Sequence, residues 1–404
     1  MKHKSLSILF MLFFGLFTQA GNYQAEEISD TTPPKAPLLG EYVEGESQLR
    51  GMAESLSTIL VIVKGQEIGR GTVQPDGFFT ISIIPQASDT TIEVIAVDKS
   101  NNQSSPATLH VSERVKRIYG ENRYLTAVEI SKEAFPNGAN TVVLVRGDDF
   151  PDALAAGPLA YQLGAPILST LSNHLPEYVK NEIVRLKAKN VIIIGGDGAV
   201  TKKVETELGT SLGLHVDRIA GVNRYDTAAK IAERLGIKDR VVLAYGKGYA
   251  DALSMSPYAA RDGMPILLTE TTSIPRETQH ILEKAEVTFV VGGEGVVSEQ
   301  VFVQIENGIR ISGATRFETN ARILELFGSF SNSAVLATGR NYADALTGSV
   351  LAARLDSPIL LVEKDYVPNP LKNWLTSYGQ VKQYKLLGGP GVLSDEMIST
   401  IPLY

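Results

Sequence analysis

Hydrophobic and polar positions follow two different patterns along the chain, and the change falls near residue 112. Before it, short runs rich in β-branched and aromatic residues at 57–63, 78–84 and 91–97 are separated by turn signals such as Pro75-Asp76-Gly77. This pattern predicts an all-β sandwich over residues 41–112. After it, continuous apolar strands alternate with helical patterns, which predicts parallel sheets covered by helices on both faces.

The second pattern occurs three times. In each copy an Arg, a Gly and a second Arg followed by an aromatic ring keep the same spacing, and the copies start at residues 117, 218 and 310. A unit of about 100 residues is long enough to bury a core of its own, unlike a solenoid repeat. The sequence therefore predicts three tandem α/β repeats of Rossmann-like or flavodoxin-like type, at 113–212, 213–306 and 307–404.

Each copy carries three further landmarks after this motif: an Asp-Ala-Leu at the start of a helix, a Pro-Ile-Leu that leads into a strand, and a strand that ends in Gly-Gly-x-Gly. These landmarks begin at Asp152, Asp251 and Asp344; at Pro166, Pro265 and Pro358; and at Gly195, Gly292 and Gly388.

The N-terminus has the features of a secretion signal. Lys2 and Lys4 precede an apolar run at 6–17 that is too short to span a bilayer, and Thr18 and Ala20 then place small residues at the two positions that a signal peptidase reads. We expect a signal peptide at 1–20, with an uncleaved anchor as the alternative, and a proline-containing linker at 21–40. No later segment resembles a membrane span, and the chain has no Cys, which excludes disulfides and thiol chemistry.

Charge is unevenly distributed between the parts of the chain. Residues 21–112 hold five Lys or Arg and twelve Asp or Glu, whereas the repeats are nearly balanced. This distribution gives no support for nucleic-acid binding by bulk electrostatic attraction. An anion bound by the repeats would have to meet locally concentrated arginines.

The Gly-Gly-x-Gly turn resembles part of a dinucleotide fingerprint, since glycines let a pyrophosphate approach a helix N-terminus. The third Gly or Ala of that fingerprint is replaced by Thr201, Ser298 and Ser394, which are good helix caps. A tight structural turn is therefore the preferred interpretation, and no cofactor is predicted.

The arginines of the repeated motif are the main candidate site residues. Guanidinium groups recognise carboxylate and phosphate in a bidentate manner, so two arginines per repeat are suited to an anionic polymer. The neighbouring ring is suited to stacking on a sugar or on the Arg itself. The alternative is structural, with each Arg tying a loop to carboxylates or carbonyls. The candidates are Arg117, Arg123 and Tyr124; Arg218, Arg224 and Tyr225; and Arg310, Arg316 and Phe317.

Asp152, Asp251 and Asp344 have two possible roles. Each lies in a first helical turn, where a negative charge complements the helix dipole. Each is also a natural partner for the repeated arginines across a boundary between repeats. The sequence leaves both roles open.

No catalytic constellation is evident. The five His residues share no repeat position and have no zinc-ligand spacing, and there is no Gly-x-Ser-x-Gly elbow. We expect no metal site and no enzymatic activity, although paired carboxylates can be selected only by geometry.

Residues 117–404 resemble the cell-wall-binding repeat 2 family of Gram-positive surface proteins, through RIYGENRYLTA, RIAGVNRYDTA and RISGATRFETN and the three further landmarks. The resemblance implies a flavodoxin-like fold in each repeat, pseudo-threefold packing and attachment to an anionic wall polymer. It also implies that the Arg-Tyr/Phe pairs lie near contacts between repeats or polymer grooves. The opening Asp30-Thr-Thr-Pro-Pro, the Pro-Asp-Gly-Phe-Phe turn and the segment 96–104 resemble a bacterial immunoglobulin-like domain.

Together these features predict a secreted, non-enzymatic protein of the Gram-positive cell surface. Its expected partner is an anionic wall polymer or peptidoglycan, with the β-sandwich as a spacer or a contact for other surface proteins. The alternatives are a peptidoglycan-modifying hydrolase and the regulatory subunit of an amidase.

Overall fold

The computed structural model describes residues 30–236, 239–328, 332–378 and 381–402. The predicted signal peptide at 1–20 lies outside these ranges, as do residues 21–29 of the predicted linker. The described chain divides into two compact units, a smaller β unit within residues 30–110 and a larger α/β unit that contains residues 111–404. Short segments at 43–45 and 86–89 are assigned to the larger unit.

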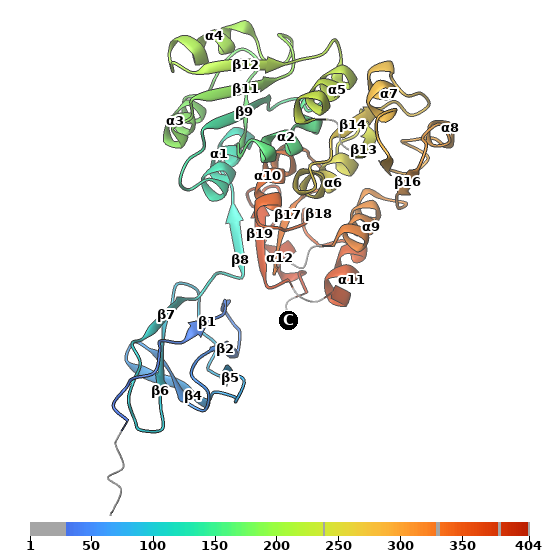
Figure 1. The fold of residues 1–404 in the computed structure, drawn as a ribbon. Helices are drawn as coiled ribbons and strands as arrows, with labels where there is room; N and C mark the ends of the chain where they lie inside the picture. Colours follow the sequence, from blue (N-terminus) through green and yellow to red (C-terminus); the bar gives the residue numbers. More distant parts are fainter. Residues whose placement is uncertain (1–29, 237–238, 329–331, 379–380, 403–404) are drawn as a thin grey trace, which may run out of the picture. The chain divides into compact units, whose positions relative to one another are not determined.

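The β unit is built from antiparallel strands in two sheets, which confirms the predicted immunoglobulin-like sandwich (Figure 1). Alternate residues point into the core, as the sequence pattern predicts: Ile59, Val61, Ile92 and Val94 are fully buried. The sheets have the order β1-β2-β5 and β4-β3-β6-β7, with strands β1 (Leu38–Leu39), β2 (Gln48–Met52), β3 (Thr58–Val63), β4 (Gln66–Thr72), β5 (Phe78–Ser82), β6 (Thr91–Val97) and β7 (Ala107–His110).

The α/β unit contains three four-stranded parallel sheets, one for each repeat, so the predicted fold class is confirmed. Their central strands are mainly apolar, and stretches such as residues 142–145 are fully buried, as parallel sheets covered on both faces require. The orders are β10-β9-β11-β12, β14-β13-β15-β16 and β18-β17-β19-β8. The strands are β8 (Val115–Ile118), β9 (Thr141–Arg146), β10 (Ile167–Thr170), β11 (Asn190–Ile194), β12 (His215–Ile219), β13 (Arg240–Tyr245), β14 (Ile266–Thr269), β15 (Val287–Val291), β16 (Gly308–Ile311), β17 (Ser333–Thr338), β18 (Ile359–Val362) and β19 (Gln383–Leu387).

The sheets are displaced from the sequence repeats by one strand. The strand that carries the first Arg of each motif joins the sheet of the preceding repeat: β12 pairs with β11, and β16 pairs with β15. Strand β8 of repeat 1 pairs with β19 of repeat 3, which closes the arrangement into a ring. The repeat boundaries at 113, 213 and 307 stay predictions and refer to the sequence repeat alone. In space, each repeat contributes one strand to the sheet of a neighbouring repeat, so the sheets do not follow these boundaries.

Helices α2, α6 and α10 pack against one another at the centre of the α/β unit, one from each repeat (Figure 1). Equivalent small residues meet there, since a Cβ atom on Gly157 would lie 2.2 Å from Ser256 Oγ and 3.1 Å from Ser349 Oγ. The helices are α1 (Arg123–Ala134), a 3₁₀ turn (Ala153–Ala155), α2 (Ala156–Gln162), α3 (Glu177–Leu186), α4 (Lys202–Thr210), α5 (Arg224–Leu235), α6 (Ala250–Arg261), α7 (Arg276–Leu282), α8 (Glu299–Phe302), α9 (Arg316–Phe327), α10 (Ala343–Arg354), α11 (Asn369–Tyr378) and α12 (Asp395–Ser399).

Candidate functional site

The first Arg of each motif is engaged by the Gly-Gly-x-Gly turn of the sheet that its strand joins. Arg218 Nη1 donates to Gly195 O at 2.7 Å, and its guanidinium also contacts the Glu205 carboxylate in α4. In the other two repeats Arg117 and Arg310 donate to carbonyls in and just after the corresponding turns. The side chains of all three arginines are only 15–17% exposed. These three side chains therefore hold the turns in place.

The second Arg of each motif lies at the start of a helix and makes fewer contacts. Arg123 Nη1 donates to Gly147 O at 2.9 Å, Arg224 Nη1 to Gly246 O at 2.8 Å, and Arg316 Nη1 to Gly339 O at 2.6 Å. With the described residues, the Nε and Nη2 atoms of these side chains make no hydrogen bond. All three arginines are half-buried, so each guanidinium is fixed at one nitrogen and keeps donors available.

The aromatic ring of each motif packs inside its own repeat. A Cβ atom on Gly147 would lie 2.5 Å from Tyr124 Cε1, and Gly246 and Gly339 have the same relation to Tyr225 and Phe317. The ring thus supports the glycine whose carbonyl holds the neighbouring Arg. This contact was not anticipated from the sequence, which suggested stacking on a sugar or on that Arg.

The three motif aspartates lie directly against the first glycine of the Gly-Gly-x-Gly turns. A Cβ atom on Gly195, Gly292 or Gly388 would lie 2.8–3.0 Å from Oδ2 of Asp152, Asp251 and Asp344, and these glycines have φ values of +103°, +121° and +115°. Both the conformation and the close approach therefore require glycine. Asp152 and Asp251 also line the two crevices described below.

Two of these aspartates interact electrostatically with arginines of the next repeat. Burial raises the pKa of Asp251 to about 6, and the positive charge of Arg316 opposes this shift. Asp344 has the same relation to Arg123, with a pKa raised to about 6 by burial. Among the described residues no ion pair joins either couple, so the cross-boundary partnership suggested by the sequence is one of charge rather than contact.

Two pseudo-equivalent crevices open where the strands of one repeat end beside the motif of the next. Crevice A, between repeats 1 and 2, has a volume of about 430 Å³ and includes Arg146, Asp152, Gly196 and Arg224. Crevice B, between repeats 2 and 3, has a volume of about 570 Å³ and is lined by Lys247, Asp251, Gly293, Glu294, Gly295, Thr315 and Arg316, among others. Ligands commonly bind at the carboxyl ends of parallel strands, which is where both crevices lie.

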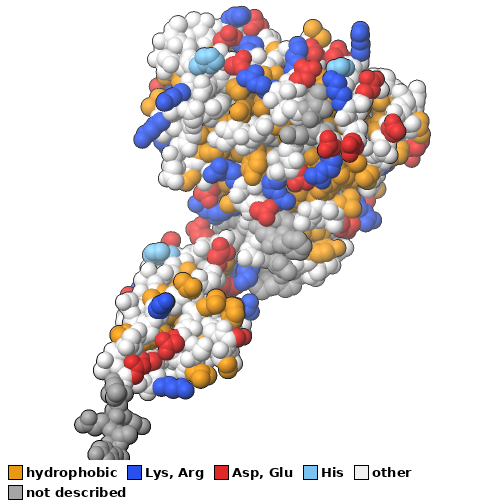
Figure 2. Space-filling model, in the orientation of Figure 1, with side chains coloured by type: hydrophobic (Ala, Val, Ile, Leu, Met, Phe, Trp, Pro, Cys, Tyr) orange, Lys and Arg blue, Asp and Glu red, His pale blue; other side chains and the backbone are white. Residues whose placement is uncertain are grey.

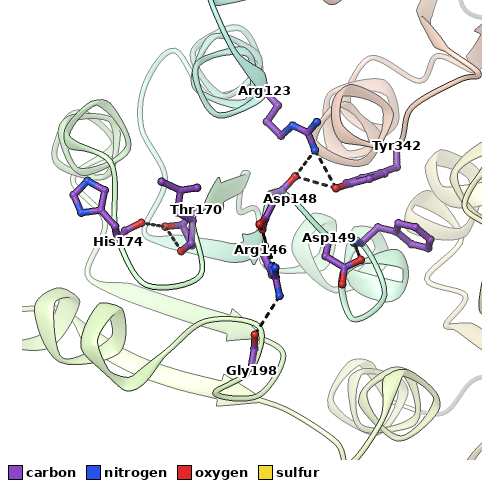
Figure 3. A network of polar contacts seen from close by, with 11 residues as sticks. Arg123, Arg146, Asp148, Asp149, Thr170, His174, Gly198 and Tyr342 are labelled. Atoms are coloured by element: carbon purple, nitrogen blue, oxygen red, sulfur yellow. Dashed lines mark hydrogen bonds and ion pairs between the residues drawn. The ribbon is translucent and has the colours of Figure 1, made fainter.

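Other charged groups at this end of the sheets are largely paired. Arg146 Nε contacts Asp148 at 2.6 Å and its Nη1 donates to Gly198 O (Figure 3), and Lys247 Nζ lies 2.8 Å from Glu270. The face of the α/β unit in Figure 2 shows acidic and basic side chains interspersed. The second arginines are thus the least compensated cations in the two crevices.

An aromatic cluster on the pseudo-threefold axis connects these sites. The rings of Phe150, Tyr249 and Tyr342 occupy equivalent positions in the three repeats, with centroids 5.1–6.0 Å apart. Tyr342 Oη accepts from Arg123 and donates to Gly147 O (Figure 3), and Tyr249 Oη makes the same contacts with Arg316 and Gly339 O. This cluster was not predicted from the sequence, although an aromatic residue stands two positions before each Asp-Ala-Leu and was a usable signal.

The fold and these crevices define a protein of tandem α/β repeats whose candidate sites lie at the boundaries between repeats. The model of the family "Cell wall binding domain 2 (CWB2)" matches residues 117–205, 218–302 and 310–398, so the chain belongs to this family of cell-wall-binding repeats. A bacterial Ig domain model matches residues 34–113. Both predicted resemblances are confirmed.

Two proteins of Bacillus subtilis (strain 168) are similar to the repeat region. The chain is 36% identical over 289 residues to the N-acetylmuramoyl-L-alanine amidase LytC, and 36% identical over 288 residues to an amidase enhancer. These matches cover 71% and 70% of this chain but only 58% and 40% of the two relatives. The similarity therefore omits a large part of each relative.

Two solved structures of Clostridium difficile proteins have similar folds. Cwp6 superposes with a TM-score of 0.68 at 24% identity, over 90% of this chain and 67% of its own. Cwp8 superposes with a TM-score of 0.66 at 27% identity, over 78% of this chain and 59% of its own.

The described ranges lack two kinds of feature. They contain no helix long and apolar enough to cross a bilayer. Nor, within those same ranges, is there a group of three or more His, Cys, Asp or Glu arranged to hold a metal ion.

Proposed function

We propose that the three repeats attach this protein noncovalently to an anionic polymer of the Gram-positive cell wall, and that the crevices between repeats bind the polymer. The observation that carries this proposal is the state of the second arginines. Arg224 in crevice A and Arg316 in crevice B are each anchored through Nη1, while Nε and Nη2 make no hydrogen bond with the described residues. A pre-positioned guanidinium with free donors suits a phosphate or carboxylate.

The six motif arginines then have two roles. Arg117, Arg218 and Arg310 are structural, because carbonyls and carboxylates use their donors. Among the second arginines, Arg224 and Arg316 are the polymer-contacting pair in this proposal, and Arg123 is their counterpart at the boundary between repeats 3 and 1. The aspartates Asp152 and Asp251 line the crevices, where a carboxyl group is suited to accept hydrogen bonds from sugar hydroxyls.

Binding of this kind depends on repetition. A single guanidinium that bonds a charged group contributes about 1.5–3 kcal/mol, which is too little for stable attachment. Two or more sites on one chain that engage a repeating polymer raise the overall affinity by about 10²–10⁴. The tandem arrangement is therefore an integral part of the proposed mechanism.

We further propose that the protein is secreted, lacks catalytic activity and uses its immunoglobulin-like domain as a spacer or a contact for other surface proteins. The similarity to an amidase and to an amidase enhancer supports a second candidate function, which is a role in peptidoglycan hydrolysis. Dye release from labelled walls by the purified protein, alone and with an added wall amidase, distinguishes the two.

The test of wall attachment is sedimentation of the full chain with purified Gram-positive walls, before and after acid extraction of their anionic polymers. We expect binding to intact walls and its loss after extraction. Unchanged binding to extracted walls would assign the ligand to peptidoglycan, and an absence of binding to intact walls would reject the proposal.

The site assignment needs a variant that removes charge and keeps the fold. Gln retains an amide donor for the glycine carbonyl, so R123Q, R224Q and R316Q combined should lower wall affinity by about 10²-fold or more through lost avidity. A matched triple variant at exposed helical positions, K132Q, K203Q and R322Q, removes the same charge elsewhere and should bind like the unmodified chain. Equal losses in both variants would contradict a localised site.

A further inference from the structure

The boundary between repeats 3 and 1 differs from the other two at the motif residue that follows Arg-Ile. Crevices A and B are both walled by the second glycine of a Gly-Gly-x-Gly turn, Gly196 and Gly293. The third counterpart is Gly389. The residue that follows Arg-Ile in the adjoining motif is Ala220 at crevice A, Ser312 at crevice B and Tyr119 at the third boundary.

The Tyr119 ring covers the third glycine. A Cβ atom on Gly389 would lie 2.9 Å from Tyr119 Cδ2 and 3.4 Å from Cε2. At crevice B the nearest atoms to the same position are 3.8 Å and 3.9 Å away, and at crevice A nothing lies within 4 Å. The ring thus occupies space that the other two boundaries leave open, while Tyr119 as a residue stays 48% exposed.

The rest of the third boundary keeps the parts of a crevice. Arg123 is anchored by Gly147 O and Tyr342 Oη, with Nε and Nη2 free of hydrogen bonds to the described residues. Asp344 lies against Gly388 as Asp152 and Asp251 lie against their glycines. What fills the space beside the turn at this boundary is therefore the aromatic side chain of Tyr119.

We propose that Tyr119 closes the third crevice, so that the wall polymer is bound through crevices A and B and the number of working sites is two. This inference rests on the proposed function of the crevices. It makes residues 119, 220 and 312 the determinants of how many sites a chain of this architecture offers, because a small residue opens a site and an aromatic residue fills it.

The experiment opens and closes sites in the full chain and measures the apparent affinity for purified walls by sedimentation. Y119A should open the third crevice beside Arg123 and raise the affinity about tenfold through added avidity. A220Y combined with S312Y should fill crevices A and B and lower it about 10²-fold. Adding Y119A to that double variant should restore part of the binding, because the third site then remains open. Y119F keeps the ring and should behave like the unmodified chain.

The outcomes separate the two hypotheses. If the unmodified chain fails to bind walls, the proposed function is wrong. If it binds but Y119A weakens or does not change the affinity, the closed third site is wrong, and weakening identifies Tyr119 as a stacking surface for the polymer. Unchanged binding by A220Y/S312Y would also overturn the inference, provided that circular dichroism confirms a folded chain.

Discussion

At the scale of single residues, position in the motif decides what an arginine does. Arg218 and its counterparts lie on a strand and point at a turn and the segment after it, which together offer two or more acceptors, so their donors are used within the fold. Arg224 and its counterparts begin a helix, and Nη1 of each donates to one glycine carbonyl. Their Nε and Nη2 donors make no hydrogen bond with the described residues. In our proposal, two arginines only six positions apart along the chain therefore have separate roles, one in structure and the other in binding.

The buried aspartates should give the α/β unit a characteristic pH dependence. Asp344 is 8% exposed, and burial raises its pKa from 3.8 to about 6. Between these values the folded state binds more protons than the unfolded state, so the free energy of unfolding should fall as the pH rises from 3.8 to about 6. D344N removes the titrating group and should make this slope shallower.

Trp374 provides the measurement for this prediction. It is the single tryptophan of the chain and is buried in α11, so its fluorescence during urea unfolding reports on the α/β unit alone. The control is D365N, which changes an exposed residue in the same repeat. Parallel pH profiles for D344N and the unmodified chain would show that Asp344 is not a source of the slope.

At the scale of elements, the glycines of the Gly-Gly-x-Gly turn differ in whether the fold would tolerate a side chain at their position. Gly195 has φ +103°, and a Cβ atom there would lie 2.7 Å from Ala199 Cβ and 2.8 Å from Asp152 Oδ2. Gly198 in the same turn has open space around it. G195A should therefore destabilise the α/β unit by about 2–4 kcal/mol, and G198A by less than about 1 kcal/mol.

This comparison is internally controlled because both variants add one methyl group to one turn. The difference in the urea midpoint, followed by Trp374 fluorescence, tests it directly. Similar midpoints for G195A and G198A would contradict the close packing of Asp152 against the turn.

The sequence predicted the main strands and the three repeats, but it did not predict which strands pair with one another across repeats. Apolar runs such as 141–145 identified the central strands, and the repeated landmarks gave three α/β repeats. The pairing of Val115–Ile118 with Gln383–Leu387 was not foreseeable, because hydrophobic pattern specifies which face of a strand is buried and not which sheet it joins. For the same reason the sequence did not separate Arg218 from Arg224, since that difference depends on the turn each side chain reaches.

At the scale of the whole α/β unit, stability depends on contacts that close the ring of repeats. Buried apolar residues of all three repeats form a continuous core, and β8 carries the start of repeat 1 into the sheet of repeat 3. Such long-range pairings connect the first and last parts of the unit. We therefore expect the three repeats to unfold together rather than one by one, unlike a linear solenoid.

Only two of the three rings in the aromatic cluster on the axis carry a hydroxyl group, and this difference predicts a stabilising substitution. Tyr342 Oη and Tyr249 Oη each link a neighbouring Arg to a glycine carbonyl, but Phe150 has no hydroxyl to do the same for Arg224 and Gly246. F150Y should supply this third link by pseudo-symmetry and raise the free energy of unfolding by about 1 kcal/mol.

The opposite substitution, Y342F, deletes an existing link and leaves Gly147 O with one donor fewer, so it should lower stability by about 1–2 kcal/mol. Both changes involve one oxygen atom at equivalent positions, which makes them a matched pair for Trp374-monitored unfolding. A destabilised F150Y would mean that the Phe150 ring edge does not face Gly246, and that the threefold relation seen in the backbone does not extend to this side chain.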